Sequence, residues 1–184
     1  MGRTIIVGDG PAGLSAALLL AKNGHETLVY GGDATLLHHA HLHNYLGVLD
    51  TDGSAFQATA RAQVEAVGAS LVDAEVVGIE ATDDGSFTVR TADETLRADH
   101  VLLAGGRSVA KLAAALGAAA DDGAVTTDQD SATSVPGLYA AGHLVRPQRS
   151  QAIISAGDGA KAALDILSRE AGEDVHDWDS PPSD

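Results

Sequence analysis

A glycine-rich turn near the N-terminus constrains the fold of this chain more than any other feature. The run Gly8-Asp9-Gly10-Pro11-Ala12-Gly13 directly follows the β-branched, mostly apolar run Thr4-Ile5-Ile6-Val7 and precedes a Leu- and Ala-rich stretch that ends at Gly24. A β-branched run bounded by glycine predicts a buried strand, and the stretch that follows predicts a helix. In such a strand-to-helix turn, glycines let the backbone approach a pyrophosphate at the positive end of the helix. The sequence therefore predicts a dinucleotide-binding βαβ unit.

Composition narrows the class of protein and of partner. The chain has 184 residues, with 26 acidic against 11 basic side chains and a formal net charge of −15. Such a chain is long enough for one domain with a real core. Nucleic acids and anionic membranes are disfavoured as partners because both are bound by clustered Lys and Arg. We interpret the acidic bias as adaptation to a salt-rich cytoplasm, where charge repulsion is screened.

Cysteine content and hydropathy limit the chemistry and the location. The sequence has no cysteine, which excludes disulfides, thiolate nucleophiles and Cys-type zinc sites. It has no apolar run of about eighteen residues, so we expect no membrane span. The first expected strand starts near residue 3, which leaves no room for a signal peptide. We therefore expect a cytoplasmic protein.

The order of the expected elements predicts an α/β fold with a parallel sheet and a small antiparallel β-meander. Residues 1–171 form one domain in this prediction, and the acidic, Pro-containing residues 172–184 form a disordered tail. Residues 31–53 are a long loop, and Ser54 caps the helix after it. The expected strands are 3–8, 27–30, 71–72, 101–104, 124–126 and 138–141, the meander strands are 76–79, 87–90 and 95–96, and the helices are 11–23, 54–67, 111–116 and 151–167.

Four separated stretches point to one known family. They are Gly8 to Ala17, the run Asn44-Tyr45-Leu46-Gly47, Thr133 to His143 and Gln151 to Gly159. Together they resemble the motifs of the thioredoxin-reductase-like, FAD-dependent pyridine nucleotide-disulfide oxidoreductases, and they span residues 3–168. The resemblance implies a three-layer Rossmann-like FAD/NAD(P)-binding domain. It also implies that the N-terminus of the last helix faces the flavin and stabilises negative charge on the reduced ring.

The resemblance carries site residues over to this chain. The residues it implies for FAD binding are Gly8, Gly10, Pro11, Ala12, Gly13, Asn44, Val76, Ala104, Gly105, Gly142, His143, Gln151, Ala152 and Ile153. Asp33 joins them as the nearest carboxylate for the adenosine ribose, because Tyr30 stands where the family has its acidic residue. His143 replaces the family's Asp after Ala-Ala-Gly, and a neutral imidazole can still accept a hydrogen bond.

Two departures from the family affect the expected activity. Only about thirty residues separate Gly106 from Pro136, where the family inserts a second nucleotide domain with a Cys-x-x-Cys pair. The chain by itself therefore cannot carry electrons from NADPH to a disulfide.

Four of the eight histidines lie in the run His38-His39-Ala40-His41-Leu42-His43. In an extended chain, alternate residues share one face, and His-x-His on one face can ligate zinc, copper or iron. An imidazole beside a flavin could instead transfer protons, and a solvated surface loop is the third reading. We name His41 and His43 as catalytic candidates and assign no metal site.

The sequence favours a minimal FAD-binding oxidoreductase. Its electrons would come from a separate donor protein or from NAD(P)H, and a homodimer would cover the flavin edge. One alternative is a non-catalytic FAD- or ADP-binding module or subunit, which the missing dithiol favours. Another is an NAD(H)-binding Rossmann enzyme, against which the match at Gln151 argues. Fold alone does not decide among these.

Overall fold

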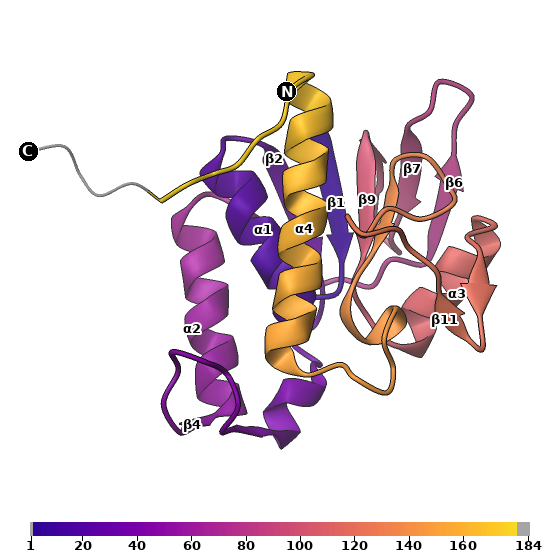
Figure 1. The fold of residues 1–184 in the computed structure, drawn as a ribbon. Coiled ribbons are helices and arrows are strands. Elements are labelled where there is room, and N and C mark those ends of the chain that lie inside the picture. Colours follow the sequence, from indigo (N-terminus) through magenta and orange to yellow (C-terminus); the bar gives the residue numbers. More distant parts are fainter. Residues whose placement is uncertain (1, 180–184) are drawn as a thin grey trace, which may run out of the picture.

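A five-stranded parallel sheet forms the centre of the computed structural model, which describes residues 2–179 (Figure 1). Its strand order is β12-β9-β1-β2-β5, and every neighbouring pair is parallel. Parallel neighbours need crossover connections, and those from β1 to β2, from β2 to β5 and from β9 to β12 contain helices. The strands are β1 (Arg3–Val7), β2 (Glu26–Tyr30), β5 (Ser70–Val72), β9 (His100–Leu103) and β12 (Leu138–Ala140).

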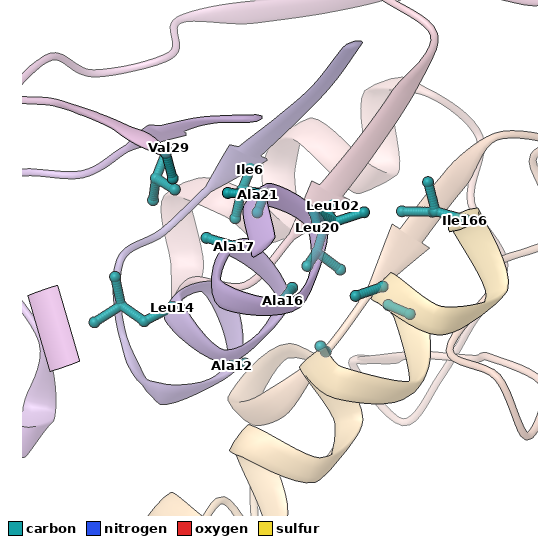
Figure 2. Close-up of a cluster of buried hydrophobic side chains, with 14 of the residues drawn as sticks. Ile6, Ala12, Leu14, Ala16, Ala17, Leu20, Ala21, Val29, Leu102 and Ile166 are labelled. Carbon is teal, nitrogen blue, oxygen red and sulfur yellow. The ribbon is translucent and has the colours of Figure 1, made fainter. Parts of the chain in front are cut away.

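Three helices cover one face of the sheet: α1 (Pro11–Lys22), α2 (Gly53–Ala66) and α4 (Ala152–Ala171). Side chains of alternate strand positions, such as Ile6 and Leu102, point into this layer. There they meet small and branched residues of α1 and α4, among them Leu20 and Ile166, which are fully buried (Figure 2). The alanines of α1 let α4 pack closely against it.

The opposite face of the sheet carries the meander and α3 (Arg107–Ala115). The meander consists of β6 (Gly78–Ala81), β7 (Phe87–Arg90) and β8 (Thr95–Ala98), each antiparallel to the next. The other set of alternate strand residues, including Ile5 and Leu103, packs against Phe87 and Val109 on this side. The predicted three-layer α/β architecture with a parallel sheet and a small meander is confirmed.

The differences from the expected elements are local. The first meander strand begins two residues later than predicted, and α3 begins at Arg107 rather than at 111. Asp52 caps α2, not Ser54, because the Asp52 carboxylate accepts hydrogen bonds from the amides of Ser54 and Ala55.

The remaining short elements lie in the connections. The predicted loop 31–53 contains a 3-10 turn, η1, and a two-stranded ribbon of β3 and β4. The bounds are η1 (Leu36–His39), β3 (His41–Leu42), β4 (Thr51–Asp52), β10 (Ala120–Asp121), β11 (Ala124–Val125) and η2 (Gly142–Leu144).

The segment after α4 is described as far as residue 179. Val175 packs partly against the helical layer, and its amide donates to Ser168 Oγ at 2.9 Å. Lys22 of α1 pairs with Asp177 at 3.3 Å. The predicted disorder covers residues 172–184, of which 180–184 lie outside the described residues. Within residues 2–179, no helix is both long and apolar enough to span a bilayer.

Two glycines of α4 have opposite environments. A Cβ on Gly159 would lie 1.9 Å from the backbone oxygen of Ala12, whereas a Cβ on Gly157 would meet nothing within 4 Å. The close contact at Gly159 brings α4 against the start of α1. Gly159 is therefore required for packing, and Gly157 is not.

We expect the two alanine substitutions to change stability in opposite directions. Gly157→Ala should raise the free energy of unfolding by ~0.5–1 kcal/mol through helix propensity. Gly159→Ala should lower it by ~1–3 kcal/mol through overpacking against α1. Urea denaturation of both variants measures the difference, and a shift of equal sign would refute this account of the α1–α4 contact.

Candidate cofactor-binding site

A cavity of about 1190 Å³ opens at the carboxyl ends of the parallel strands. The loops that follow β1, β2, β5, β9 and β12 line it, together with the N-terminus of α4. Ligands of open α/β sheets bind at this end of the strands. The volume exceeds the ~300–1,000 Å³ typical of small-molecule sites, as an elongated ligand such as a dinucleotide requires.

Three helices begin at this cavity, and in none of them does a side chain cap the backbone amides of the first turn. The N-cap residues of α1, α3 and α4 are Gly10, Gly106 and Gln151, and none of the three makes a side-chain capping hydrogen bond. None of these helices has an acidic residue in its first turn. Helix α2, whose N-terminus does not line the cavity, is capped by Asp52. The cavity thus gathers free amides and the positive ends of three helix dipoles, which suits an anionic ligand.

The backbone of the first turn lies open to the cavity because Gly8 adopts a positive φ of 113°. A Cβ at this position would come within 2.5 Å of the Ala104 backbone oxygen. The ends of β1 and β9 therefore approach each other as only glycine permits. Behind them, a Cβ on Gly13 would lie 1.9 Å from the Gly8 oxygen, so Gly13 lets α1 start immediately after the turn.

The structure brings most of the sequence-predicted site residues to this one cavity. Those that line it are Gly8, Gly10, Pro11, Ala12, Asn44, Val76, Ala104, Gly105, Gly142, His143, Gln151 and Ala152. Gly13, Asp33 and Ile153 are not among the lining residues. Of the two catalytic candidates, His41 lines the cavity, whereas His43 lines a smaller hollow formed by residues 43–48.

The end of β2 shows why Asp33 lies apart. Its carboxylate receives hydrogen bonds from Gln57 at 3.1 Å and contacts the His38 ring at 3.1 Å. Burial opposes ionisation of Asp33, but the hydrogen bonds from Gln57 and His38 and the nearby Arg61 charge outweigh it and lower the pKa of Asp33. The Asp33 carboxylate therefore interacts with Gln57 of α2 and with His38 of its own loop, and it does not line the cavity.

Tyr30, at the end of β2, is buried and lines the cavity. Its hydroxyl donates to Glu94 of the meander at 2.8 Å. Burial, and then this hydrogen bond, raise the pKa of Tyr30 to about 12, so the hydroxyl stays protonated and keeps donating. The side chain ties β2 to the meander.

Asp73 is a lining carboxylate that the sequence analysis did not single out. It follows β5, which is the neighbour of β2 in the sheet. A Cβ on Gly32 would lie 3.2 Å from its Oδ1, which places this exposed carboxylate beside the end of β2. In the sequence, Asp73 can be recognised only as an acidic residue directly after the short strand β5. That it lies beside the end of β2 follows from the pairing of β5 with β2, which the sequence alone does not reveal.

Asp9 and Arg61 form a second feature that the sequence analysis missed. Asp9 is 5% exposed, and its carboxylate forms an ion pair with Arg61 of α2 and accepts the Asp33 amide at 3.0 Å. Gln57 donates to the Asp9 backbone oxygen at 2.7 Å. Two side chains of α2 thus hold the glycine-rich turn from behind.

The opposite end of the cavity is lined by polar side chains. The amide nitrogen of Asn44 donates to Gln151 Oε1 at 3.3 Å, which joins the long loop to the start of α4. His143 is exposed and contacts Ser150 Oγ through Nδ1 at 3.1 Å. Arg107, in the first turn of α3, adds an exposed cation to the lining. By contrast, Arg146 pairs with the buried Asp158 at 3.1 Å.

Residues 45–159 match the model of the family described as pyridine nucleotide-disulphide oxidoreductase. The chain belongs to this family. The match covers well over half of the sequence and confirms the resemblance seen in its motifs.

Curated relatives agree with this membership. The chain is 34% identical over 113 residues to a thioredoxin reductase of Streptomyces clavuligerus, an alignment that covers 59% of this chain and 35% of the relative. It is 28% identical over 178 residues to a mercuric reductase of Acidithiobacillus ferrooxidans, which covers 94% of this chain and 30% of the relative. The chain thus spans about a third of the length of the curated relatives that it matches.

Solved structures of the family share the fold. A thioredoxin reductase from Gloeobacter violaceus superposes with a TM-score of 0.85 at 18% identity, covering 97% of this chain and 99% of that one. A ferredoxin-flavin thioredoxin reductase from Clostridium acetobutylicum gives a TM-score of 0.80 at 17% identity, covering 93% and 99%. At sequence identities of 18% and 17%, these superpositions show a shared fold and nothing beyond it.

Removal of the cation behind the glycine-rich turn should destabilise the protein. Arg61→Met leaves the Asp9 carboxylate buried without its partner, and we expect a loss of about 3 kcal/mol, the lower end of the cost of breaking a buried pair. Arg97→Met, which removes an exposed pair with Asp84, should change stability by less than ~1 kcal/mol. Chemical denaturation compares the two, and equal losses would contradict the structural role of the buried pair.

Proposed function

We propose that this chain binds FAD in the cavity and acts as a flavoprotein oxidoreductase of thioredoxin reductase-like type. The observation that carries the proposal is the convergence of three uncapped helix N-termini on one large cavity. A dinucleotide carries a doubly charged pyrophosphate and further acceptor atoms along its length, which suit free amides at the positive ends of helices. Family membership supports FAD as the dinucleotide.

The lining fits the parts of this cofactor. The turn from Gly8 to Ala12 and the start of α1 would hold the pyrophosphate, and Val76 would contact the adenine. Asp73 takes the role of hydroxyl acceptor for the adenosine ribose in this proposal, because it faces the cavity beside the end of β2. Gln151 and Ala152 would bring backbone groups of α4 to the flavin ring.

When bound, the flavin supplies the capacity to accept and release two electrons. The chain contributes the environment of the ring. The N-terminus of α4 favours negative charge beside it, and His41 is an exposed imidazole of the lining that can donate or accept a proton. These 184 residues have no cysteine, so in this proposal an acceptor dithiol lies outside them.

The electron donor in this proposal is also a separate molecule, either a donor protein or NAD(P)H at the exposed flavin face. The name of the Clostridium structure, a ferredoxin-flavin thioredoxin reductase, supports a protein donor. A non-catalytic FAD-binding module is the second candidate, and the lack of any cysteine favours it.

Purification and reduction separate the candidates. We expect protein prepared in concentrated KCl to show a flavin spectrum, or to acquire one on titration with FAD but not with NAD. Anaerobic reduced ferredoxin or NADPH should then bleach it. A flavin that only dithionite reduces would favour the binding module, and no binding of FAD would overturn both readings.

Charge at the start of α3 gives a direct test of the uncapped N-termini. Gly106 has a negative φ, and a Cβ there would meet nothing within 4 Å, so Gly106→Asp and Gly106→Asn should both fold and cap α3. Only the aspartate adds a negative charge beside the anionic cofactor. We expect its FAD affinity to be about 5- to 30-fold below that of the asparagine variant, which is ~1–2 kcal/mol of repulsion. Equal affinities of the two variants in fluorescence titration would contradict the proposal.

The ribose assignment makes a separate prediction. Asp73→Asn should weaken FAD binding about 10-fold, because a charge-assisted hydrogen bond is worth ~1.5–3 kcal/mol. Asp83→Asn, an exposed change in the turn between β6 and β7, is the matched control and should bind FAD as the unmodified chain does. If Asp33→Asn weakened binding instead, the ribose would be assigned to Asp33.

A further inference from the structure

The ribbon beside the cavity brings together three side chains that the proposed function leaves without a common role. His41 and His43 are two residues apart, on either side of Leu42, which is 4% exposed and points into the protein. Alternation along the extended segment puts the two imidazoles on the same, outer side. Asp50 comes from the other limb of the ribbon, one residue before β4.

The potential ligand atoms of these residues converge. His41 Nε2 lies 3.0 Å and His43 Nδ1 lies 2.8 Å from the same oxygen of Asp50, Oδ1. The two imidazole centroids are 4.8 Å apart. One ligand atom from each of the three residues lies within 4.8 Å of both others, an arrangement found at no other group of His, Asp and Glu side chains in residues 2–179.

We propose that His41, His43 and Asp50 bind a divalent transition-metal ion of the zinc class. Two imidazole nitrogens and one carboxylate oxygen are a donor set that suits Zn²⁺ and its first-row neighbours, whereas Mg²⁺ and Ca²⁺ prefer oxygen donors only. Three protein ligands leave at least one coordination position for water or for a small ligand. Metal binding here does not require bound FAD, although it shares His41 with the proposed flavin site.

The neighbouring histidines show that the convergence is specific within the loop. The His38 ring is engaged by Ser54 Oγ at 2.9 Å and by the Asp33 backbone oxygen at 2.8 Å. His39 is exposed and belongs to no such cluster. In the cluster, the side chains of His41, His43 and Asp50 are 47%, 72% and 71% exposed, so an ion can enter directly from solvent.

A bound ion would act on the ribbon and on the rim of the cavity. It would join the two limbs of the loop that carries the exposed residues Leu46 and Leu49. Because His41 also lines the large cavity, the metal would lie at its edge. The ion would thereby fix the position of the loop relative to the cavity.

Calorimetric titration of the full chain with ZnCl₂ tests the proposal. The titration uses protein without a polyhistidine tag, because a tag would itself bind Zn²⁺. Excess MgCl₂ is present to occupy the surface carboxylates, which bind cations through oxygen alone. We expect one equivalent of Zn²⁺ to bind. His43→Gln and Asp50→Asn should each weaken binding at least ~10-fold, the lower end of what losing even an outer-shell partner costs, and His39→Gln should leave it unchanged.

Nuclear magnetic resonance of the unmodified chain gives a readout that needs no variant. The imidazole signals of His41 and His43 should shift on addition of one equivalent of Zn²⁺, with those of His39 unchanged. No binding heat would overturn the proposal. So would a loss of affinity in His39→Gln as large as that in His43→Gln, because binding would then belong to the histidine-rich loop in general.

Discussion

The unsatisfied amides at the starts of α1, α3 and α4 are the constraint on which the site depends. A helix end that no side chain caps is costly unless water or a ligand serves it. This chain leaves three such ends facing one cavity, and it caps the helix that starts elsewhere with Asp52. In a chain with a net charge of −15, the dipoles of three helix ends bring positive potential to the cavity, whose described lining has one Lys or Arg side chain, the exposed Arg107.

Close backbone contacts at two glycines hold the strands and helices that surround the cavity in position. Gly8 lets β1 meet β9, and Gly159 lets α4 meet α1. On the far side of the turn, Arg61 and Gln57 of α2 hold Asp9 from behind. The turn is therefore fixed from three directions, and contacts within the protein set the orientation of its amides. Such preorganisation lowers the ordering cost of binding.

The sequence predicted well what is decided locally. The strand, turn and helix from Arg3 to Lys22 follow from β-branched residues, glycines and an apolar helical stretch. The family's motifs pointed to the segments around Gly142 and Gln151, which line the same cavity. The sequence did not reveal features that depend on contacts between residues far apart in the chain. Asp73 reaches the cavity only because β5 lies beside β2, and Asp9 is neutralised by a residue 52 positions away. The first meander strand was placed too early because Val76 and Val77 look like strand residues, although Val77 is 60% exposed.

The strand order has a consequence for how this protein is made. The glycine-rich turn is synthesised before β12 and the start of α4, which the cavity also needs. A nascent chain that has released only β1 to β5 presents one of the three helix ends that flank the cavity. On the proposal that the cavity binds FAD, capture of the cofactor has to wait until the start of α4 has been synthesised.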